Sequence, residues 1–489
     1  MQQTGRLLDK LCTLCAVAFC ALIVLQNLFL IGHRGQWISL AGLAFTALIV
    51  LLFVRFLPDS PHFPLFLFLL RFLSALAVIL LIGAEPVQDF NTMYTAACQL
   101  ARGSHEYLYL DTCYFYNWAY QTAFVVYESL VIRLFGEGYL ALQLLNALYM
   151  GGTAVLVYAI AKRLLPGHSG VAAGILYLFY PAPLFLAAVL TNQHLSVFLL
   201  YLGIWVLLGG KDGPSLPRAA LGGLLLALGN AMRPIGVIPL LAGLLWCVIG
   251  LFLRFRREKG WVLSTLARPV VLAVTYALAG ALLSGLIVWT GANPNGLTNN
   301  QPMWKFVLGF NEESSGAWNA EDYNNIYLLQ GEEADAAMRA VVRERLSVGP
   351  VRLAKLMLRK CDLMWADNEY MSWGFGHLDH SASLAGPLTV GQGVNLICYW
   401  DKGAYLLLFL MALYWLVRRL FRRNAEFCHL FPVLVFCGYF AVHLLIEVQS
   451  RYRYFLMPTI AILAGMAISG LFRRKSDHQT QTPGSGNAA

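Results

Sequence analysis

Long apolar runs recur along the chain and constrain its fold more than any other feature. A helix needs about 20 apolar residues to cross a bilayer. Runs of roughly that length occur at 11–31, 37–57, 64–83, 139–163, 170–188, 193–209, 219–232, 235–253, 268–290, 398–417, 429–446 and 454–472. The sequence therefore predicts an all-α polytopic membrane protein with about 12 transmembrane helices. The run at 219–232 is short, so the interpretation of 219–253 as two full spans or as a re-entrant pair stays open.

The composition excludes a soluble enzyme. Of the 489 residues, 58% are hydrophobic and only 12% are charged, whereas a soluble domain is about 45–50% apolar and about 25% charged. So little charge leaves too little polar surface to keep a globular enzyme in water, and the low charge also rules out a disordered chain. The net charge of +9 is typical of nucleic-acid-binding proteins, but also of membrane proteins with basic cytoplasmic loops.

The positions of the basic residues decide between these two explanations. If the N-terminus is cytoplasmic, the cytoplasmic loops and termini hold 19 Lys and Arg, and the opposite short loops hold seven. An excess of Lys and Arg marks the cytoplasmic side. We therefore predict a multi-pass protein of the cell membrane with both termini in the cytoplasm and no nucleic-acid partner. Arg71, inside the third run, is expected to extend its stem to the cytoplasmic boundary.

Two stretches outside the apolar runs are too long to be simple connectors, and both are extracytoplasmic in this orientation. They divide the chain into six predicted parts: 1–83 with the first three membrane helices, 84–138 as a first external loop with amphipathic helices, 139–290 with helices four to nine, 291–397 as a large external loop, 398–472 with the last three helices, and 473–489 as a disordered cytoplasmic tail. Any chemistry is therefore expected in the two external loops.

The first external loop places a carboxylate, Asp89, at the mouth of the third run. A carboxylate is costly there unless it is solvated or paired. The boundary can also raise the pKa of such a group, which suits a general base. The alternative is that Asp89 caps a helix predicted at 91–102. The apolar face of that helix has helical spacing and consists of Met93, Ala96, Ala97 and Leu100.

Aromatic residues crowd the next part of the loop: Tyr107, Tyr109, Tyr114, Phe115, Tyr116, Trp118 and Tyr120. Tyr and Trp favour the membrane interface, so part of this run needs no function. The same rings suit stacking on a sugar or holding a lipid chain, and Tyr116 is a candidate for such a contact. Glu106 and Asp111 are the other carboxylates that could face the site, with solvated loop positions as the alternative.

Two stretches in and after the first external loop carry a recognisable pattern. The first is Pro86-Val87-Gln88-Asp89-Phe90, followed by Tyr94, Ala96-Ala97 and Leu100-Ala101-Arg102-Gly103. The second contains Tyr116, Tyr120-Gln121, Leu134-Phe135-Gly136 and Leu140-Ala141-Leu142-Gln143-Leu144-Leu145-Asn146. Both resemble bacterial GT-C glycosyltransferases, polytopic enzymes similar to glycosyltransferase family 39 and the protein mannosyltransferases. The resemblance implies a GT-C fold, a sugar donor linked to polyprenyl phosphate, and Asp89 as the catalytic base.

The chain also departs from these relatives. Many of them carry two acidic residues where Gln88-Asp89-Phe90 offers one. We therefore predict no metal and no other cofactor, with a divalent metal as the alternative that this leaves open. Relatives often have an acidic residue near the external start of a later helix pair, where this chain reads Thr191-Asn192-Gln193-His194.

A donor phosphate at the membrane boundary needs cations at the same depth. The stretch Glu447-Val448-Gln449-Ser450-Arg451-Tyr452-Arg453-Tyr454 lies at the predicted external mouth of the last span and resembles an acidic-x-x-x-Arg-Tyr pattern of the relatives. Arg451 and Arg453 are candidates for the phosphate because a guanidinium binds its oxygens in pairs, and Glu447 is a candidate substrate contact. Pairing with Glu447 and anchoring to headgroups is the alternative for the arginines. Arg233 and Lys305 are two further candidate phosphate ligands.

The second external loop contains Gly309-Phe310-Asn311 and Gly316-Ala317-Trp318-Asn319, which resemble a Gly-x-Asn … Gly-x-Trp-Asn stretch of some relatives. Asn311, Trp318 and Asn319 are candidate sugar contacts through hydrogen bonds and ring stacking, and a compact surface loop is the alternative. Helices predicted at 333–347 and 350–365 are expected to lie along the membrane or to cover the site.

These observations favour an integral membrane glycosyltransferase, a hexosyltransferase that uses a polyprenyl-phosphate sugar. Its acceptor would be an extracytoplasmic cell-envelope glycan, lipid or protein, and direct displacement predicts inversion at the anomeric carbon. The alternative is a transporter or flippase of a lipid-linked saccharide. Transporters place charge near the midplane between inverted repeats, whereas no clear repeat is seen here and the acidic residues avoid the apolar runs.

Overall fold

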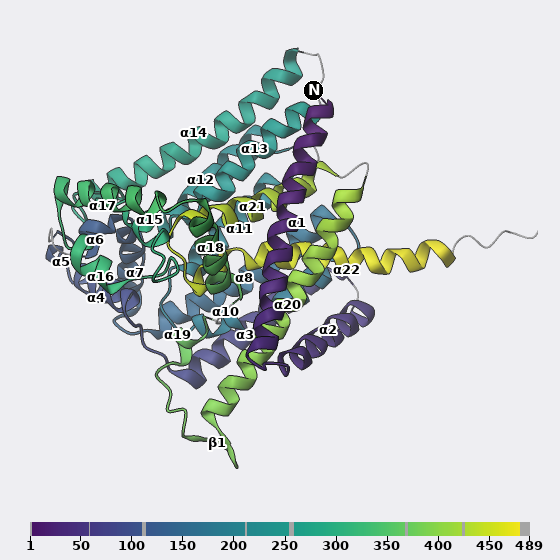
Figure 1. Cartoon of the computed structure of the whole chain (residues 1–489), viewed down its shortest axis with the longest axis horizontal. Coiled ribbons are helices and arrows are strands. Elements are labelled where there is room, and N and C mark those ends of the chain that lie inside the picture. The colour runs from purple at the N-terminus through teal and green to yellow at the C-terminus, as the bar shows by residue number, and fades with distance from the viewer. Residues whose placement is uncertain are drawn as a thin grey trace, which may run out of the picture.

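The computed structural model describes residues 2–57, 59–109, 114–210, 213–253, 259–366, 370–422 and 426–479. Helices make up most of these residues (Figure 1). The described strands form one short hairpin, in which β1 (Ser383–Ala385) pairs antiparallel with β2 (Leu388–Thr389). The predicted all-α polytopic membrane class is therefore confirmed.

Seven described helical segments are long and apolar enough to cross a membrane. Six lie in α1 (Gln2–His33), α2 (Ser39–Phe56), α3 (Phe63–Ile82), α8 (Leu140–Leu164), α14 (Lys259–Trp289) and α20 (Val390–Phe421), and the seventh, Phe427–Leu445, includes α21 (Leu430–Leu445). Shorter apolar helices occupy the remaining predicted ranges: α9 (Ser169–Leu178), α11 (Gln193–Leu207), α12 (Leu216–Met232), α13 (Val237–Leu253) and α22 (Met457–Gln479). The number of spans, and the choice between two spans and a re-entrant pair for α12 and α13, stay predictions.

The helix predicted at 170–188 is not continuous, and this expectation was wrong. Helix α9 ends at Leu178, and a five-residue helix, α10 (Ala182–Leu186), follows. Pro181 and Pro183 cause the break, because proline lacks an N–H and its ring disfavours a helical residue before it. Arg71 does not extend to the cytoplasmic boundary. It is fully buried and donates hydrogen bonds to the Leu178 and Tyr180 carbonyls, which the break leaves without helical partners.

The remaining short elements lie mostly in the two predicted external loops. In the first loop they are α4 (Asp89–Ala101), α5 (Glu106–Tyr109), α6 (Tyr114–Asn117), the 3₁₀ helix η1 (Ala119–Gln121) and α7 (Thr122–Phe135). In the second they are α15 (Trp304–Gly309), α16 (Ala320–Asp322), the π-helices η2 (Tyr323–Tyr327) and η3 (Asp362–Ala366), α17 (Gly331–Leu346), α18 (Pro350–Cys361) and α19 (Ser372–Phe375). Two 3₁₀ helices flank α21: η4 (Phe427–His429) and η5 (Ser450–Phe455).

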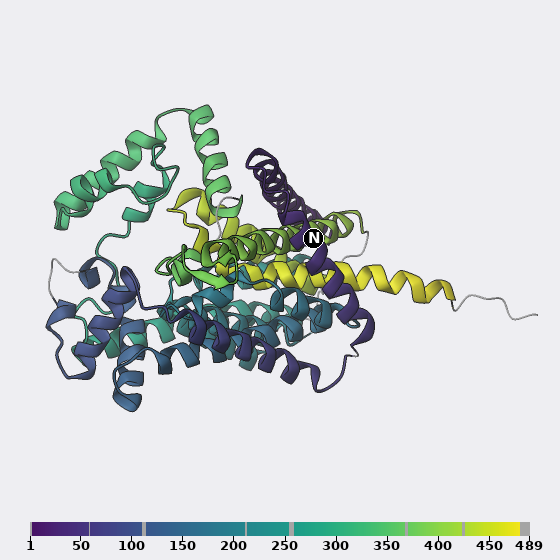
Figure 2. The same cartoon turned by 90° about the horizontal axis from the view of Figure 1, so that it is seen from below.

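The last helix forms the centre of the bundle. The yellow α22 runs through the other helices in both views and extends beyond them (Figure 1 and Figure 2). Its side chains from Met457 to Ile468 are almost completely buried, and Gly465 lets α22 approach the α9 backbone, since a Cβ there would lie 2.6 Å from Ala173 N. A central apolar helix of this kind fixes the ends of its neighbours and the segment η5 that precedes it.

Most short elements of the two predicted external loops collect at one end of the bundle. Figure 1 shows α4, α5, α6, α15, α16 and α17 together at the left, away from the C-terminal end of α22 at the right. Helix α4 packs on α7 through a separate apolar cluster that contains the four residues predicted for its face: Met93, Ala96, Ala97 and Leu100. The predicted amphipathic helix at 91–102 is thus present as α4. The two predicted external loops, which are far apart in sequence, therefore meet at this end.

Candidate active site

A cavity of about 420 Å³ lies among these short elements and the segment that leads into η5. Both predicted external loops contribute to its walls. Its lining residues are Asp89, Phe90, Tyr114, Asn117, Trp118, Tyr120, Gln121, Asn192, Arg233, Trp304, Lys305, Leu308, Trp318, Tyr323, Tyr327, Leu328, Leu329, Gln330, Glu447, Gln449, Arg451 and Tyr452. Ligand sites are concave and carry a few convergent polar groups, and five of these residues have charged side chains: two carboxylates and three cations.

Asp89 reaches the cavity because of an unusual backbone turn. The preceding residue, Gln88, has φ +49° and ψ −126°, a region that residues other than glycine rarely adopt. Helix α4 begins at Asp89 itself, and the residue at its cap position, Gln88, makes no capping hydrogen bond. The alternative that Asp89 caps the helix was therefore wrong. Its side chain is 45% exposed, so its carboxylate is open to a ligand in the cavity.

Arg451 is the cation next to this carboxylate. Its Nη2 lies 3.7 Å from Asp89 Oδ2, and its side chain is only 7% exposed. The guanidinium is held from several sides: its carbon lies 4.4 Å from the Trp373 ring centroid and 5.1 Å from that of Phe90, and its Nε donates to Gln449 Oε1 at 2.6 Å. A cation fixed by rings and a hydrogen bond is positioned in advance for an anion.

Lys305 and Glu447 form an ion pair in the same wall. Glu447 also accepts hydrogen bonds from Gln449 Nε2 at 2.7 Å and from the Tyr452 hydroxyl at 3.2 Å. Burial alone would raise the pKa of Glu447, but Lys305 lowers it below its usual range. Burial alone would lower the pKa of Lys305, but Glu447 raises it on balance. Both groups are therefore charged at neutral pH.

The ring of Tyr452 brings the three cations together. Its centroid lies 5.0 Å from the guanidinium carbon of Arg233, 5.8 Å from that of Arg451 and 5.9 Å from Lys305 Nζ. Arg233 directly follows α12 and donates to Asn192 Oδ1 at 3.2 Å. With Asp89 and Glu447, the charged set has one net positive charge. The arrangement is thus suited to bind a ligand with a single negative charge.

Two glycines hold the second external loop against the segment that follows α21. A Cβ at Gly309 would overlap the Leu445 carbonyl oxygen, and a Cβ at Gly316 would lie 2.8 Å from Lys360 Cδ. Val448 N donates to Gly316 O at 2.9 Å. Lys360 Nζ donates to the Gly309 and Leu444 carbonyls at 2.8 and 2.6 Å. Lys305 lies in α15, which ends at Gly309, and Glu447 lies in the segment after α21, next to Val448. These contacts therefore fix Lys305 and Glu447 relative to each other.

The predicted sugar contacts in this loop have different positions. Trp318 lines the cavity and is 54% exposed. Asn311 and Asn319 are not among the lining residues. They hold the buried Asp322: Asn311 Nδ2 donates to its carboxylate at 2.8 Å, and Asn319 Oδ1 accepts from its backbone N–H at 2.9 Å. Arg345 binds the same carboxylate through two hydrogen bonds of 2.9 and 2.6 Å. The two asparagines therefore stabilise the loop.

Three other predicted residues do not line the cavity. Arg453 is buried between the rings of Tyr370 and Tyr405, with its guanidinium carbon 5.4 and 4.6 Å from their centroids. Glu106 is exposed in α5. Tyr116 contributes its backbone carbonyl to a hydrogen bond with Asn300. Asp111 lies outside the described residues. The cavity thus collects Asp89, Arg233, Lys305, Glu447 and Arg451, together with Trp318.

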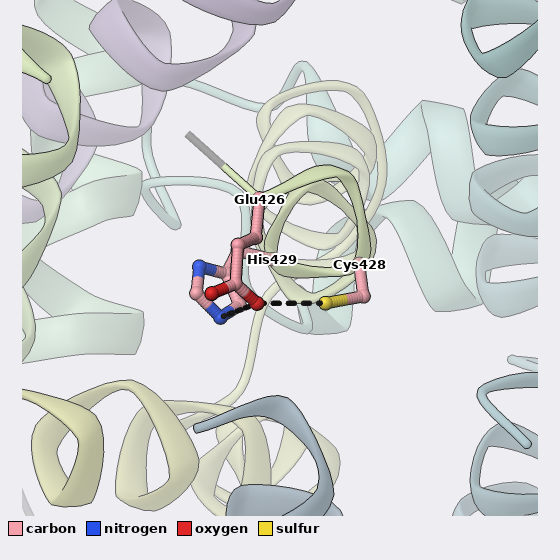
Figure 3. Close-up of side chains that lie close together, drawn as sticks. All are labelled: Glu426, Cys428 and His429. Atoms are coloured by element: carbon pink, nitrogen blue, oxygen red, sulfur yellow. Dashed lines mark hydrogen bonds and ion pairs between the residues drawn. The ribbon is translucent and has the colours of Figure 1, made fainter. Parts of the chain in front are cut away.

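Within the described residues, a group of three metal-type donors occurs elsewhere: Glu426, Cys428 and His429, whose ligand atoms lie within 4.8 Å of one another (Figure 3). His429 Nε2 faces Glu426 Oε2 at 3.6 Å, but it also lies 2.8 Å from the Leu164 carbonyl, so this nitrogen carries the proton and has no lone pair for a metal beside Glu426. Arg418, Arg419 and Arg422 line the small pocket beside His429 and oppose a cation. The group precedes α21, whereas Glu447 follows it, roughly 24 Å away along the helix. We assign no metal to this group.

Sequence reasoning missed Gln449, Tyr452 and Asn192 as parts of the site. A partial signal was present for the first, because Glu447 and Gln449 stand two positions apart, Gln449 has extended backbone angles of −143° and 148°, and both residues line the cavity. A period of two places alternate side chains on one face. Asn192 lies where the relatives often have an acidic residue, and here its amide accepts a hydrogen bond from Arg233.

Comparison with known proteins gives a family match over part of the chain. The model of the dolichyl-phosphate-mannose-protein mannosyltransferase family matches residues 125–277. This confirms the predicted resemblance to GT-C glycosyltransferases and a multi-pass membrane protein. The matched residues include α8, α9, α11 and α12 and end before the second external loop. A search of curated proteins finds no match.

Two solved structures of the oligosaccharyltransferase AglB from the archaeon Archaeoglobus fulgidus are also similar. One, in complex with an inhibitory peptide and a dolichol-phosphate, is 14% identical with a TM-score of 0.43 over 88% of this chain and 53% of that chain. The other, tethered to an acceptor peptide with the NVT sequon, is 14% identical with a TM-score of 0.48 over 86% of this chain and 51% of that chain. This chain spans about half the length of each.

Proposed function

We propose that the chain transfers a sugar from a polyprenyl-phosphate-linked donor to a hydroxyl of an extracytoplasmic acceptor, with inversion at the anomeric carbon. One observation carries this proposal: Asp89 and the three cations Arg233, Lys305 and Arg451 line one cavity, with Arg451 3.7 Å from Asp89. A sugar phosphodiester has one negative charge, which matches the single net positive charge of the set. The family match over residues 125–277 supports glycosyl transfer in the membrane.

In the proposed reaction Asp89 is the general base. Its carboxylate accepts the proton of the acceptor hydroxyl while the acceptor oxygen forms a bond to the anomeric carbon. The bond between this carbon and the phosphate oxygen breaks, and the electron pair leaves with the polyprenyl phosphate. Attack opposite the leaving phosphate inverts the configuration. Within the described residues no hydrogen bond holds the Asp89 carboxylate, so its oxygens are available to the acceptor.

The cations have separate parts in this reaction. Arg451 and Arg233 each present a guanidinium at the Tyr452 ring, and a guanidinium can bind two phosphate oxygens at once. Lys305 is already paired with Glu447, so it adds less free charge. We therefore assign the departing phosphate mainly to Arg451 and Arg233, with Lys305 as the third ligand. Developing negative charge is stabilised most by cations fixed before the reaction.

The test compares Asp89→Asn with Glu106→Gln in purified protein reconstituted in liposomes. Glu106 is an exposed carboxylate of the same loop outside the cavity, so its variant controls for loss of negative charge. With radiolabelled polyprenyl-phosphate hexoses, Asp89→Asn should lower transfer about 10²–10⁴-fold, and Glu106→Gln should keep it. Normal transfer by Asp89→Asn would refute the proposed base. Labelled lipid that crosses the membrane intact would instead support the transporter.

A further inference from the structure

The cavity has a second wall that the proposed catalytic groups do not use. Six aromatic residues form it, and we call them the aromatic wall: Trp118, Tyr120, Trp304, Trp318, Tyr323 and Tyr327. They come from the two predicted external loops, which are far apart in sequence but meet here. The joining contact is between Trp118 and Tyr327, whose ring centroids are 6.2 Å apart with planes 20° from parallel.

Ring contacts connect the wall from end to end. Trp318 lies 6.1 Å from Tyr323, Tyr323 lies 4.9 Å from Tyr327, and Trp118 lies 6.3 Å from Tyr120. Exposure falls along this series, from 54% at Trp318 to 9% at Tyr327 and 8% at Trp118. At the buried end, Lys305 Nζ lies 5.0 Å from the Trp118 ring centroid. The wall therefore runs from solvent to the cations of the proposed donor site.

The wall is uncharged. The cavity-lining residues between 318 and 330 are Trp318, Tyr323, Tyr327, Leu328, Leu329 and Gln330, and none is ionised at neutral pH. In α6 and η1, beside Trp118 and Tyr120, the other polar lining side chains are the uncharged Tyr114, Asn117 and Gln121. Aromatic faces bind apolar ring surfaces, while phenol and amide groups bind hydroxyls. A neutral chain of rings that carry hydroxyls fits these groups, and a charged acceptor finds no partner on them.

The backbone of the wall argues against a peptide. Extended peptides commonly bind by adding a strand to an exposed sheet edge. In the part of the chain that the structure describes, the strands are β1 and β2, and neither lines the cavity. Four of the six wall residues lie in helical segments, in η1, α15 and η2, and Trp118 and Trp318 lie in the adjoining loop segments. The backbone N–H groups of Trp118, Trp304 and Tyr323 donate to carbonyls of their own segments, and that of Tyr120 donates to Asn299 Oδ1, so few are available to an extended chain.

We propose that the aromatic wall is the acceptor subsite and that the acceptor is a neutral saccharide chain, one ring of which stacks on Trp318. This inference rests on the proposed function, because it assigns the second substrate of the same cavity. The deep end of the wall delivers the terminal hydroxyl toward Asp89 and the donor, and the exposed end receives the rest of the chain. The transfer step is the one written above, with a sugar hydroxyl as the attacking group.

The first experiment measures binding without turnover. Uncharged di- to tetrasaccharide octyl glycosides are titrated against Asp89→Asn protein in detergent, and binding is followed by saturation-transfer NMR. We expect binding that tightens with chain length and weakens about tenfold in Asp89→Asn with Trp318→Ala, but not with Trp318→Phe. Trp289→Ala is the matched control, because Trp289 is 83% exposed and does not line the cavity. Absence of saccharide binding, or binding indifferent to Trp318→Ala, overturns the inference.

The second experiment measures transfer by the active protein from radiolabelled polyprenyl-phosphate hexoses. The acceptors are the same glycosides, a Ser- and Thr-containing peptide, and phosphatidylglycerol vesicles alone. We expect label on the glycosides, and an acceptor KM raised about tenfold by Trp318→Ala with the donor KM unchanged. Label on the peptide or lipid only overturns the saccharide assignment but keeps the glycosyltransferase. Saccharide binding without consumption of any donor contradicts the proposed function and leaves the subsite in place.

Discussion

The Nε of Arg451 donates a 2.6 Å hydrogen bond to Oε1 of Gln449, and the amide nitrogen of Gln449 donates to Glu447 at 2.7 Å. A neutral side chain thus separates the Lys305–Glu447 pair from the arginine beside Asp89. Glu447 is bound by Lys305, Tyr452 and Gln449, and within the described residues it makes no direct hydrogen bond or ion pair with Arg451. Gln449 therefore positions the guanidinium without cancelling its charge.

Gln449→Leu should raise the donor KM about tenfold or more, because a hydrogen bond to a charged group is worth roughly 1.5–3 kcal/mol. Gln449→Glu keeps an acceptor for Arg451 but adds a negative charge, so it should raise the donor KM further. Steady-state kinetics with a lipid-phosphate sugar measure both, with thermal unfolding to confirm that the variants fold. Equal donor KM values in both variants and the unmodified protein would contradict this role.

The Lys305–Glu447 pair should stabilise the fold over a wide pH window. The pKa of Glu447 is lower in the folded chain than its usual value of about 4.3. Its contribution to the free energy of unfolding is therefore fully present above about pH 4.3 and is lost as the pH falls through its pKa in the folded chain. The pKa of Lys305 is raised, so its contribution is present below about 10.4 and is lost as the pH rises through the folded value.

Glu447→Gln tests this window. It should lower the free energy of unfolding by about 3 kcal/mol near pH 7, because a partly buried ammonium loses its carboxylate. The difference from the unmodified protein should be constant across the middle of the window and shrink as the pH falls through the folded pKa of Glu447. Unfolding in detergent at several pH values measures it. A difference that does not shrink at low pH would show that lost packing, not the ion pair, causes the effect.

Lys360 should make stability rise with pH above neutrality. Burial lowers its pKa to about 7. Between about pH 7 and the usual value of about 10.4, the unfolded chain keeps the Lys360 proton and the folded chain loses it, so the free energy of unfolding increases with pH. Lys360→Met should be less stable overall, because the Gly309 and Leu444 carbonyls lose their donor. From pH 7 to pH 9 the unfolding temperature of Lys360→Met should rise less than that of the unmodified protein. An equal rise in both proteins would contradict a lowered pKa of Lys360.

Gly309→Ala should destabilise the protein by about 1–3 kcal/mol and weaken donor binding, because its Cβ would overlap the Leu445 carbonyl and displace α15, which carries Lys305. Gly280→Ala is the matched control. Gly280 lies within α14, and a Cβ there meets nothing within 4 Å, so alanine should be neutral or stabilising by up to about 1 kcal/mol. Thermal unfolding and donor KM are the measurements. If Gly309→Ala were as stable as Gly280→Ala, the close contact between Gly309 and the Leu445 carbonyl would not be what holds α15 against the end of α21.

The sequence predicts the class of fold well because a membrane limits the possible structures. Helices that must satisfy their own backbone groups leave a clear apolar signal, and α4 follows its apolar period in the same way. Breaks are harder to place. The helix predicted at 170–188 divides at Pro181, and its free carbonyls are bound by Arg71 from α3, a contact that only the folded chain creates.

The site was partly predictable for a similar reason. Asp89, Arg233, Lys305 and Arg451 stand at predicted external boundaries, and all four line the cavity. Arg453 shares that position in the sequence, yet its side chain lies between Tyr370 and Tyr405. In an extended stretch, side chains two positions apart, such as those of Arg451 and Arg453, would lie on the same face. The 3₁₀ helix η5, which begins at Ser450, points these two side chains in different directions. Local sequence did not indicate this change.

The net charge of the cavity has a consequence for turnover. A sugar phosphodiester has one negative charge, whereas the phosphate that leaves has about −1.5 to −2 at neutral pH. In the proposed reaction the extra negative charge appears just as Asp89 becomes neutral by taking the acceptor proton, so the charge of the filled cavity does not change. Departure of the lipid phosphate is then coupled to loss of that proton to water. The exposed Asp89 carboxylate would thus act twice in each cycle. It first accepts the acceptor proton in the reaction, and its later loss of that proton restores the charge of the cavity that matches a new donor.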